Sequence, residues 1–235
     1  MPADTESAKS RAAVAGAALV RDGMTVGLGS GTTAALLVRR LAARVEAENL
    51  KITAVSTSDE TTHLAGSLGI TVYDLDEVLA LDISLDGADE IDPAFRMIKG
   101  RGGALLREKL VASASSHRVT MITADKRVPI LGTNAAVPVE VSSIGLRHTE
   151  LRLQQLGCST TMRRRSDGSL FTTDGGNRII DCRFGQIADP QVLDSALQTL
   201  PGVLDTGIFI GLCDTLIVGT RDGFEQMESG VRNRT

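Results

Sequence analysis

The chain has 235 residues, of which 42% are hydrophobic, enough to bury one sizeable core or a main core with a smaller one beside it. Its formal net charge of −4, from 25 Lys and Arg against 29 Asp and Glu, lacks the basic excess typical of nucleic-acid-binding proteins. With no tryptophan and one tyrosine, Tyr73, the chain also offers few aromatic rings on which bases could stack.

The cysteines and the apolar runs indicate the compartment. Cys158, Cys182 and Cys213 lie far apart and form no Cys-x-x-Cys pair, which favours a reducing environment. The polar, partly acidic start does not look like a signal peptide, and no apolar run approaches the ~20 residues of a membrane helix. We therefore expect a cytoplasmic protein that binds neither membranes nor nucleic acid.

The first half of the chain alternates between short apolar runs and helix-like stretches. A helix is expected over residues 7–20. Strands are expected at residues 25–28, 52–55, 71–73, 81–85 and 119–123, and further helices at 34–45, from the caps at 56–58 to 68, and at 104–115. This alternation predicts a parallel sheet with helices on both faces.

The pattern changes near Gly132. Strand-like runs follow at residues 137–141, 159–162, 170–173, 179–182 and 203–210, with turns at 166–168 and 174–177 and helices at 146–156 and 190–200. This order predicts a small α+β domain, residues 132–209, inserted into a main domain of residues 1–131 and 210–235. Residues 216–218 are expected to return to the first sheet, and residues 227–235 to form a loose tail.

The first motif, VGLGSGTT at residues 26–33, reads as a strand, a glycine turn and a helix start. Glycines let the backbone approach an anion closely, and Ser30, Thr32 and Thr33 add hydroxyl donors beside Gly31. The pattern therefore favours a phosphate-binding loop. It lacks the lysine of a P-loop and the G-x-G-x-x-G spacing, and a glycine turn that binds nothing is the alternative.

The second motif, DGADEID at residues 86–92, directly follows a strand. Ligands of open α/β sheets bind beyond the carboxyl ends of the strands. Four carboxylates within seven positions are suited to proton transfer. The alternatives are a solvated acidic turn or a divalent-metal site, but neither a full EF-hand pattern nor zinc-ligand spacing is present, so no metal is expected.

The third motif, KGRGGALLREK at residues 99–109, is a glycine cluster that opens a helix. Lys99 could neutralise an oxyanion that the loop N–H groups also bind. Glu108 shares a helical face with Ala104 and Val111, and a carboxylate on such a partly apolar face can act as a base near neutral pH. The alternative is a surface glutamate between two basic neighbours.

Together, the three motifs resemble the ribose-5-phosphate isomerases of the A type. The matching strings follow the family's order over nearly the whole chain: GLGSGTT, STSDET, SLDGADEID, MIKGRGGALLREKLVAS, ADKRV, VPVEV, TDGGNRIIDC and PGVLDTGIF. The resemblance implies interconversion of ribose 5-phosphate and ribulose 5-phosphate, without metal or organic cofactor, in the non-oxidative pentose phosphate pathway. It also implies a Rossmann-like catalytic domain with a ferredoxin-like lid, assembled as a homodimer or homotetramer.

The resemblance further assigns the site residues. Its catalytic residues are Glu108 as the general base, Asp86 and Lys99. Its substrate-binding residues are Ser30, Gly31, Thr32, Thr33, Asp86, Gly87, Ala88, Asp89, Lys99, Gly100, Arg101, Gly102, Lys126 and Lys9. Arg101 stands where the family commonly has glycine, which adds a cation near the expected site. Lys126 follows Thr-Ala-Asp in place of the common Asp-x-Ser.

Three other classes of protein are alternatives. A sugar-phosphate-binding regulatory module would need a helix-turn-helix region, for which we expect no room before the first strand. A nucleotide- or methyl-donor-dependent transferase would need an acidic residue for the ribose after the second strand, and residues 56–59 suit that role poorly. A coenzyme A transferase relative would use a glutamate as its nucleophile.

Overall fold

The computed structural model describes residues 2–230, which divide into two compact units. The first unit comprises Met1–Ala88, Arg107–Lys126 and Gly211–Thr235, and the second Asp89–Leu106 and Arg127–Ile210. The chain thus enters the second unit twice, and each unit is described by itself. The domain boundaries expected from the sequence, at 132 and 209, stay a prediction.

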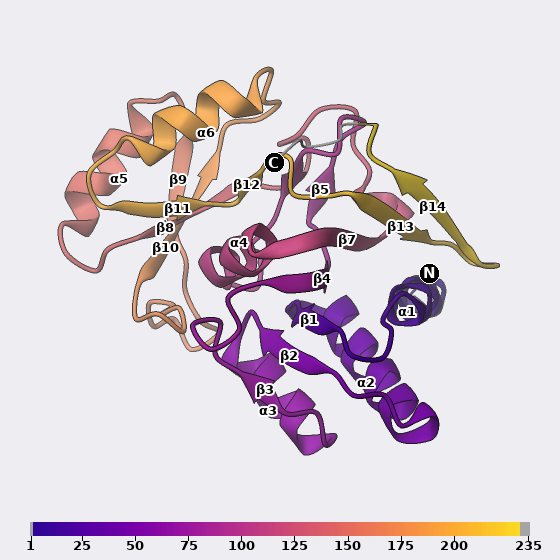
Figure 1. The fold of residues 1–235 in the computed structure, drawn as a ribbon. Helices are drawn as coiled ribbons and strands as arrows, with labels where there is room; N and C mark the ends of the chain where they lie inside the picture. Colours follow the sequence, from indigo (N-terminus) through magenta and orange to yellow (C-terminus); the bar gives the residue numbers. More distant parts are fainter. Residues whose placement is uncertain (1, 231–235) are drawn as a thin grey trace. The chain divides into compact units, whose positions relative to one another are not determined.

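A seven-stranded sheet forms the centre of the first unit, in the order β14-β13-β7-β4-β1-β2-β3 (Figure 1). Its strands are β1 (Thr25–Leu28), β2 (Thr53–Ser56), β3 (Val72–Tyr73), β4 (Leu81–Asp86), β7 (Ser115–Thr123), β13 (Thr215–Gly219) and β14 (Phe224–Glu228). All neighbouring pairs are parallel except β13 and β14, which form an antiparallel hairpin at one edge. The mixed α/β class with a parallel sheet is confirmed.

Helices cover both faces of this sheet. Successive side chains of a strand point to opposite faces, so both faces present apolar side chains that the helices bury. The helices of the unit are α1 (Pro2–Ala18), α2 (Gly31–Glu48), α3 (Asp59–Ser67), most of α4 (Leu105–Ser113) and the short 3₁₀ helix η1 (Ala124–Lys126). Val26 and Leu28 of β1 pack in one cluster with α1 and α2. Gly27 between them faces α4, where a Cβ would lie 2.5 Å from Val111.

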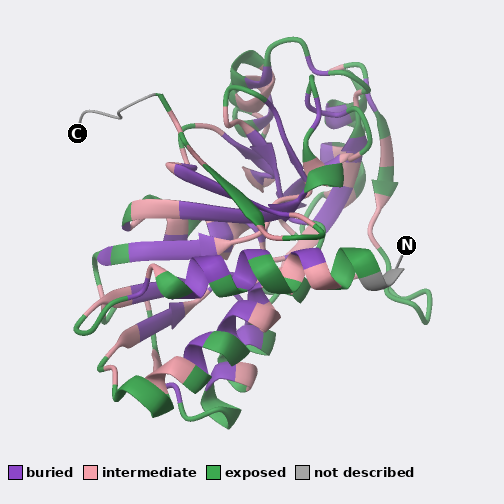
Figure 2. Ribbon diagram, turned by 90° about the vertical axis from the view of Figure 1, so that its right-hand side faces the viewer, coloured by how far each residue is buried: buried purple, intermediate pink, exposed green. Residues whose placement is uncertain are grey.

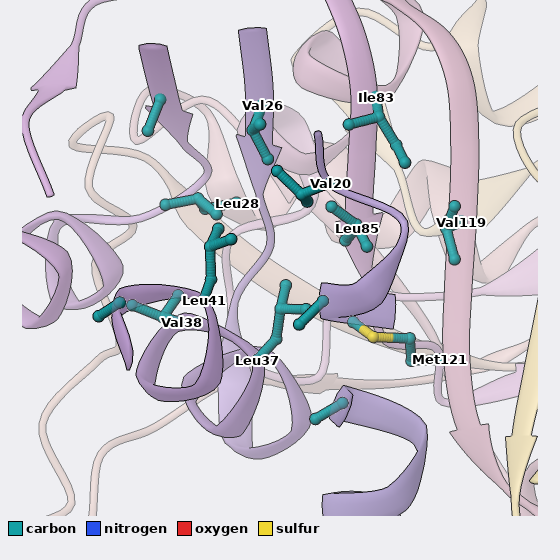
Figure 3. Packing of buried hydrophobic residues seen from close by; sticks show 14 of the residues in the cluster. Val20, Val26, Leu28, Leu37, Val38, Leu41, Ile83, Leu85, Val119 and Met121 are labelled. Atoms are coloured by element: carbon teal, nitrogen blue, oxygen red, sulfur yellow. The ribbon is translucent and has the colours of Figure 1, made fainter. Parts of the chain in front are cut away.

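The main core lies between the sheet and α1 and α2. Figure 3 shows Leu41 of α2 beside Leu28 of β1, and Leu85 of β4 belongs to the same buried cluster. In Figure 2, buried segments of α1 alternate with exposed ones, as expected of a helix with one face on a core. Among the described residues, no helix is both long and apolar enough to span a membrane.

The second unit holds a four-stranded antiparallel sheet, a three-stranded sheet and two longer helices. Its elements are β8 (Val137–Val141), β9 (Ser159–Met162), β10 (Arg178–Arg183) and β11 (Val203–Thr206) in the order β11-β8-β10-β9, then β5 (Glu90–Ile91), β6 (Met97–Ile98) and β12 (Ile208–Phe209), with α5 (Leu146–Gln154) and α6 (Pro190–Gln198). Val137, Val139 and Val141 of β8 pack with Leu153 of α5 and Leu197 of α6.

The second unit differs from expectation in two places. The expected strand 203–210 divides at Gly207, where a Cβ would lie 2.3 Å from the Lys99 carbonyl oxygen, so that β11 and β12 belong to different sheets. Residues 170–173 form a loop rather than a strand, with one isolated bridge at Leu170. β10 pairs with β8 on one side and with β9 on the other, so it lies inside the four-stranded sheet.

The first unit also departs from the sequence prediction at two points. The helix expected to reach Ser115 ends at Ser113, and β7 begins at Ser115. The expected loose tail, residues 227–235, was wrong for Met227 and Glu228, which pair with β13. Residues 231–235 of that tail lie outside the described residues.

Candidate active site

The strand order of the first unit creates a natural ligand site between β1 and β4. From β1 the chain proceeds to β2 and β3 on one side, and then returns to β4 on the other side of β1. The loops that leave β1 and β4 therefore diverge, and in open α/β sheets ligands bind in the crevice at such a switch point. The loop after β1 carries Ser30–Thr33, and the loop after β4 begins with Asp86.

Asp86 connects these two loops. Its Oδ1 accepts a 3.1 Å hydrogen bond from the Ser30 N–H and a 2.7 Å bond from the Gly87 N–H. Gly29 donates its N–H to the Leu85 carbonyl at 3.0 Å. A Cβ at Gly29 would lie 2.1 Å from Asp86 Oδ1, so only glycine permits this approach. Asp86 therefore fixes the glycine loop at the switch point.

Ser30 occupies the N-cap of α2 but uses its side chain elsewhere. Its backbone is extended, as at most N-caps, yet its hydroxyl makes no capping hydrogen bond. The hydroxyl donates instead to Glu108 Oε1 at 2.6 Å. Gly31, with φ of +78°, starts the helix, and Thr32 and Thr33 lie on its first turn with Thr32 exposed.

Glu108 is a buried carboxylate on the first turn of α4. A negative charge is favoured there by the positive end of the helix dipole. Its basic neighbour Arg107 pairs with Asp59 at 2.7 Å, on the first turn of α3. The reading of Glu108 as a surface residue is therefore wrong, and the sequence-predicted phosphate loop and base are in direct contact.

Lys9 and Lys126 lie at the same edge of the sheet. Lys126 is in η1, directly after the carboxyl end of β7. Gly219, at the carboxyl end of β13, approaches α1 so closely that a Cβ there would lie 1.9 Å from the Ala8 carbonyl oxygen. This places Lys9, the next residue, beside that strand end. Lys9 is half-buried and lies 3.9 Å from Glu6.

The second unit contains Asp89 and the loop of Lys99, Gly100, Arg101 and Gly102. Lys99 is buried, donates its N–H to the Gly207 carbonyl at 2.9 Å, and has its ammonium 5.4 Å from the centre of the Phe209 ring. Asp89 Oδ2 accepts a 2.9 Å hydrogen bond from the Arg101 N–H. Arg101 and Gly102 are exposed, whereas Gly100 is buried with φ of +98°.

The acidic motif does not act as one cluster of four carboxylates. Glu90 is buried and accepts hydrogen bonds from the N–H groups of Gly132, Asn134 and Ala135 at 2.6, 2.5 and 2.7 Å. Asp92 is also buried and pairs with Arg96 at 2.6 Å. The interpretation of all four as a proton-transfer group is therefore wrong, because these two stabilise turns. The Asp92-Pro93 pair was a local turn signal for the second of them.

Arg163 is a further residue at the glycine loop. Its guanidinium donates to the carbonyls of Gly100 and Arg101 at 2.7 and 3.0 Å. These partners are 63 and 62 positions away in sequence, so no local pattern could indicate the contact. Within residues 2–230, no group of three or more His, Cys, Asp or Glu side chains is placed to hold a metal ion.

The chain is similar to a well-described group of proteins over nearly its full length. A sequence model of ribose 5-phosphate isomerase A (phosphoriboisomerase A) matches residues 53–223. The ribose-5-phosphate isomerase A of Thermomicrobium roseum is 46% identical over 232 residues, which make up 98% of this chain and 96% of that relative.

Solved structures agree with the sequence comparison. The ribose 5-phosphate isomerase A of Methanocaldococcus jannaschii is 35% identical, has a TM-score of 0.91, and the match covers 95% of this chain and 99% of that chain. A D-ribose-5-phosphate isomerase in complex with phospho-erythronic acid is 34% identical, has a TM-score of 0.92, and the match covers 96% and 99%.

Proposed function

The chain belongs to the ribose 5-phosphate isomerase A family, and we propose that it interconverts D-ribose 5-phosphate and D-ribulose 5-phosphate through an enediolate, with Glu108 as the base. The observation that carries this proposal is the 2.6 Å hydrogen bond from Ser30 Oγ to Glu108 Oε1. It joins a loop suited to phosphate or hydroxyl groups to a buried carboxylate at the switch point of the sheet.

The reaction moves the carbonyl group from carbon 1 to carbon 2 of the sugar. Glu108 removes the proton on carbon 2, and the electrons form the double bond of a cis-enediolate. The proton of the hydroxyl group on carbon 2 passes to the oxygen on carbon 1, and the same carboxyl group returns its own proton to carbon 1. General-base catalysis by one positioned carboxylate contributes about 10²–10⁴ in rate. The Ser30 hydroxyl orients Glu108 before substrate arrives, so that less reorganisation is needed in the reaction.

The developing negative charge on the sugar oxygen needs a preorganised partner. We assign this role to Lys99 and to the N–H groups of the loop that it opens, because a buried ammonium and fixed amides stabilise an oxyanion without solvent reorganisation. Loss of one such donor costs about 3–4 kcal/mol of transition-state stabilisation. The exposed Arg101 adds positive charge to this loop.

The remaining residues bind the substrate and open its ring. Asp86 is assigned the proton transfer at the ring oxygen, with Gly87 and Ala88 beside it, and Asp89 the orientation of hydroxyl groups. The phosphate group is assigned to the loop Ser30–Thr33, supported by Lys9 and Lys126 at the same edge of the sheet. Binding energy from this remote group positions the reacting carbons.

A direct assay tests the proposal. Ketose formation from ribose 5-phosphate is measured in EDTA-treated buffer, where we expect turnover without added metal or cofactor. Phospho-erythronic acid, present in one of the solved relatives, should inhibit competitively, because its carboxylate is negatively charged where the enediolate is. A protein that binds the sugar phosphate without turning it over would be a regulatory module, and acyl transfer from coenzyme A would indicate the transferase relative.

The assembly and location follow as further parts of this proposal. We expect a homodimer or homotetramer, since Tyr73 and Leu110 expose 44% and 50% of their surfaces at a cleft lined by β2, β3, α3 and α4. We expect a cytoplasmic location, which the three free cysteines, Cys158, Cys182 and Cys213, support.

A further inference from the structure

Arg163 directly follows β9, and hydrogen bonds on both sides hold its backbone in place. Its N–H donates to the Ile179 carbonyl at 2.9 Å, and its own carbonyl accepts from the Phe171 N–H at 3.0 Å. The residue is thus held between β10 and the loop that returns from the 166–168 turn. Its side chain starts from a rigid position in the second unit, which is a precondition for a precise contact elsewhere.

The guanidinium of Arg163 has two sets of partners. Nε donates to Asp181 Oδ2 at 3.0 Å, and Nη2 pairs with Asp181 Oδ1. Nη1 donates to the carbonyls of both Gly100 and Arg101. Asp181 therefore fixes the plane of the guanidinium, and that plane fixes two successive peptide groups of the glycine loop. The planar fork of arginine suits this arrangement in a way that a lysine ammonium does not.

The contacts of Arg163 with the two carbonyl groups also determine where the N–H groups of the loop point. In a trans peptide the C=O and the following N–H point in opposite directions, and the described chain has no cis peptide. Because the Gly100 carbonyl points at Arg163, the Arg101 N–H points away from it, toward Asp89 Oδ2 at 2.9 Å. In the same way, the Arg101 carbonyl accepts a hydrogen bond from Arg163, so the Gly102 N–H of that peptide group points away from Arg163.

A second contact supports the same loop. The Arg163 guanidinium lies 6.0 Å from the centre of the Phe171 ring, and Phe171 packs against Gly103. A Cβ at Gly103 would lie 2.4 Å from the Phe171 ring, and φ of +91° also favours glycine there. Arg163, Asp181 and Phe171 thus limit the loop from one side, and Asp89 fixes it from the other.

We propose that Arg163 is a positioning residue for the reaction, which aims the Gly102 N–H at the developing oxyanion by binding the carbonyls of Gly100 and Arg101. This inference rests on the proposed function, in which the loop after Lys99 stabilises the enediolate. The positive charge of Arg163 also polarises the two peptide groups, which strengthens their N–H donors. Arg163 does not touch the substrate in this role, and it acts through the loop.

The test compares Arg163→Gln with a matched control, Arg118→Gln. Arg118 forms a similar pair with Asp214, at 16% and 22% side-chain exposure against 14% and 24% for Arg163 and Asp181. Arg118 lies in the first half of β7, and its printed hydrogen bonds join it to Asp214, which is not a predicted site residue. For each variant, kcat and KM for ribose 5-phosphate, the Kd of phospho-erythronic acid and the melting temperature are measured.

We expect Arg163→Gln to lower kcat and to weaken phospho-erythronic acid about 10- to 100-fold. KM should change less than about threefold, because the phosphate contacts remain. Arg118→Gln should lower the melting temperature and leave kcat and the inhibitor affinity unchanged. Asp181→Asn keeps the arginine but loosens its orientation, so it should lower kcat by a smaller factor. If Arg163→Gln does not fold, Asp181→Asn provides the test in its place.

Other results would contradict the inference. If Arg163→Gln and Asp181→Asn keep the wild-type kcat and inhibitor affinity, or change them no more than Arg118→Gln does, Arg163 has only a structural role. If the wild-type enzyme is active and the variants give this result, the inference about Arg163 is wrong but the proposed function still stands. A wild-type protein without isomerase activity overturns the proposed function, and the inference with it.

Discussion

The Ser30 hydroxyl donates a 2.6 Å hydrogen bond to the Glu108 carboxylate, although the two residues are 78 positions apart. Ser30 is the N-cap of α2 and Glu108 lies on the first turn of α4, and these helices lie on opposite faces of the same sheet. The two helix starts meet at its carboxyl edge, so one contact fixes the direction of the proposed base.

Substitution of Glu108 by glutamine should remove the base and keep its shape. We expect kcat to fall by about 10²–10⁴ and KM for ribose 5-phosphate to change little. Steady-state kinetics on the purified variant measure both. Glu60→Gln, at an exposed position on α3, is the control and should behave as wild type. Near-normal turnover in Glu108→Gln would contradict the assignment of Glu108 as the base.

Gly29→Ala should disrupt the loop after β1. The new Cβ would lie 2.1 Å from Asp86 Oδ1, so either the loop or Asp86 must move. A displacement of about 1 Å at a reacting group can cost about 100-fold in rate, and we expect at least that loss in kcat/KM. Gly66→Ala in α3 meets open space, and should leave activity unchanged while stabilising the fold by about 0.5–1 kcal/mol. Equal activity of the two variants would contradict the close packing of Gly29 on Asp86.

Thr33→Ala tests whether the start of α2 binds the phosphate group. We expect weaker binding of ribose 5-phosphate, and no change in the already slow reaction of unphosphorylated ribose. The ratio of kcat/KM for the two substrates is the measurement, because it isolates interactions with the phosphate. Equal losses on both substrates would show that the loop is only structural.

The sequence predicted the parts of the fold that local patterns encode. The strands at residues 25–28 and 81–85 and the glycine loop between β1 and α2 were found because apolar runs end in glycine or acidic residues. Glu108 was expected on a partly apolar face of a helix that starts in a glycine cluster, and it is buried; its role as the base stays a prediction. Its contact with Ser30 could not be derived, because it depends on which strands are neighbours in the sheet.

The errors have a common physical cause. The two-residue strands β5, β6 and β12 are too short for a period of two to appear. Residues 115–118 are polar, and they become the start of β7 only because they pair with β4. Glu90 read as part of an acidic cluster, but its three N–H partners lie more than 40 positions away. In each case long-range pairing outweighed local pattern.

The predicted oligomer can be examined by light scattering at micromolar concentration. We expect the mass of a dimer or tetramer, because exposed Tyr73 and Leu110 at one cleft are a surface that association would bury. The measurement is made on the same sample as the isomerase assay. A monomer mass with full activity would contradict the prediction.

The pair formed by Asp214 and Arg118 should make stability depend on pH. Burial disfavours the charged form of Asp214, but hydrogen bonds from the guanidinium and the N–H of Arg118 outweigh it, so the pKa of Asp214 lies below its ordinary value. A carboxyl group in the unfolded chain titrates near pH ~3.9. The stabilisation is therefore fully present above that pH, and is lost as the pH falls through the lower pKa of the folded protein.

Asp214→Asn should accordingly lower the free energy of unfolding by about 1.5–3 kcal/mol at neutral pH, the range for hydrogen bonds to a charged group. Urea unfolding of both proteins between about pH 2 and pH 7 gives the difference as a function of pH, which should be constant above about pH 4 to 5 and shrink as the pH falls below that. Asp222→Asn, at an exposed turn position, is the matched control and should leave the free energy of unfolding at neutral pH unchanged. A difference for Asp214→Asn that stays constant over this range would show that the carboxylate charge contributes nothing, and that only the shape of the side chain matters.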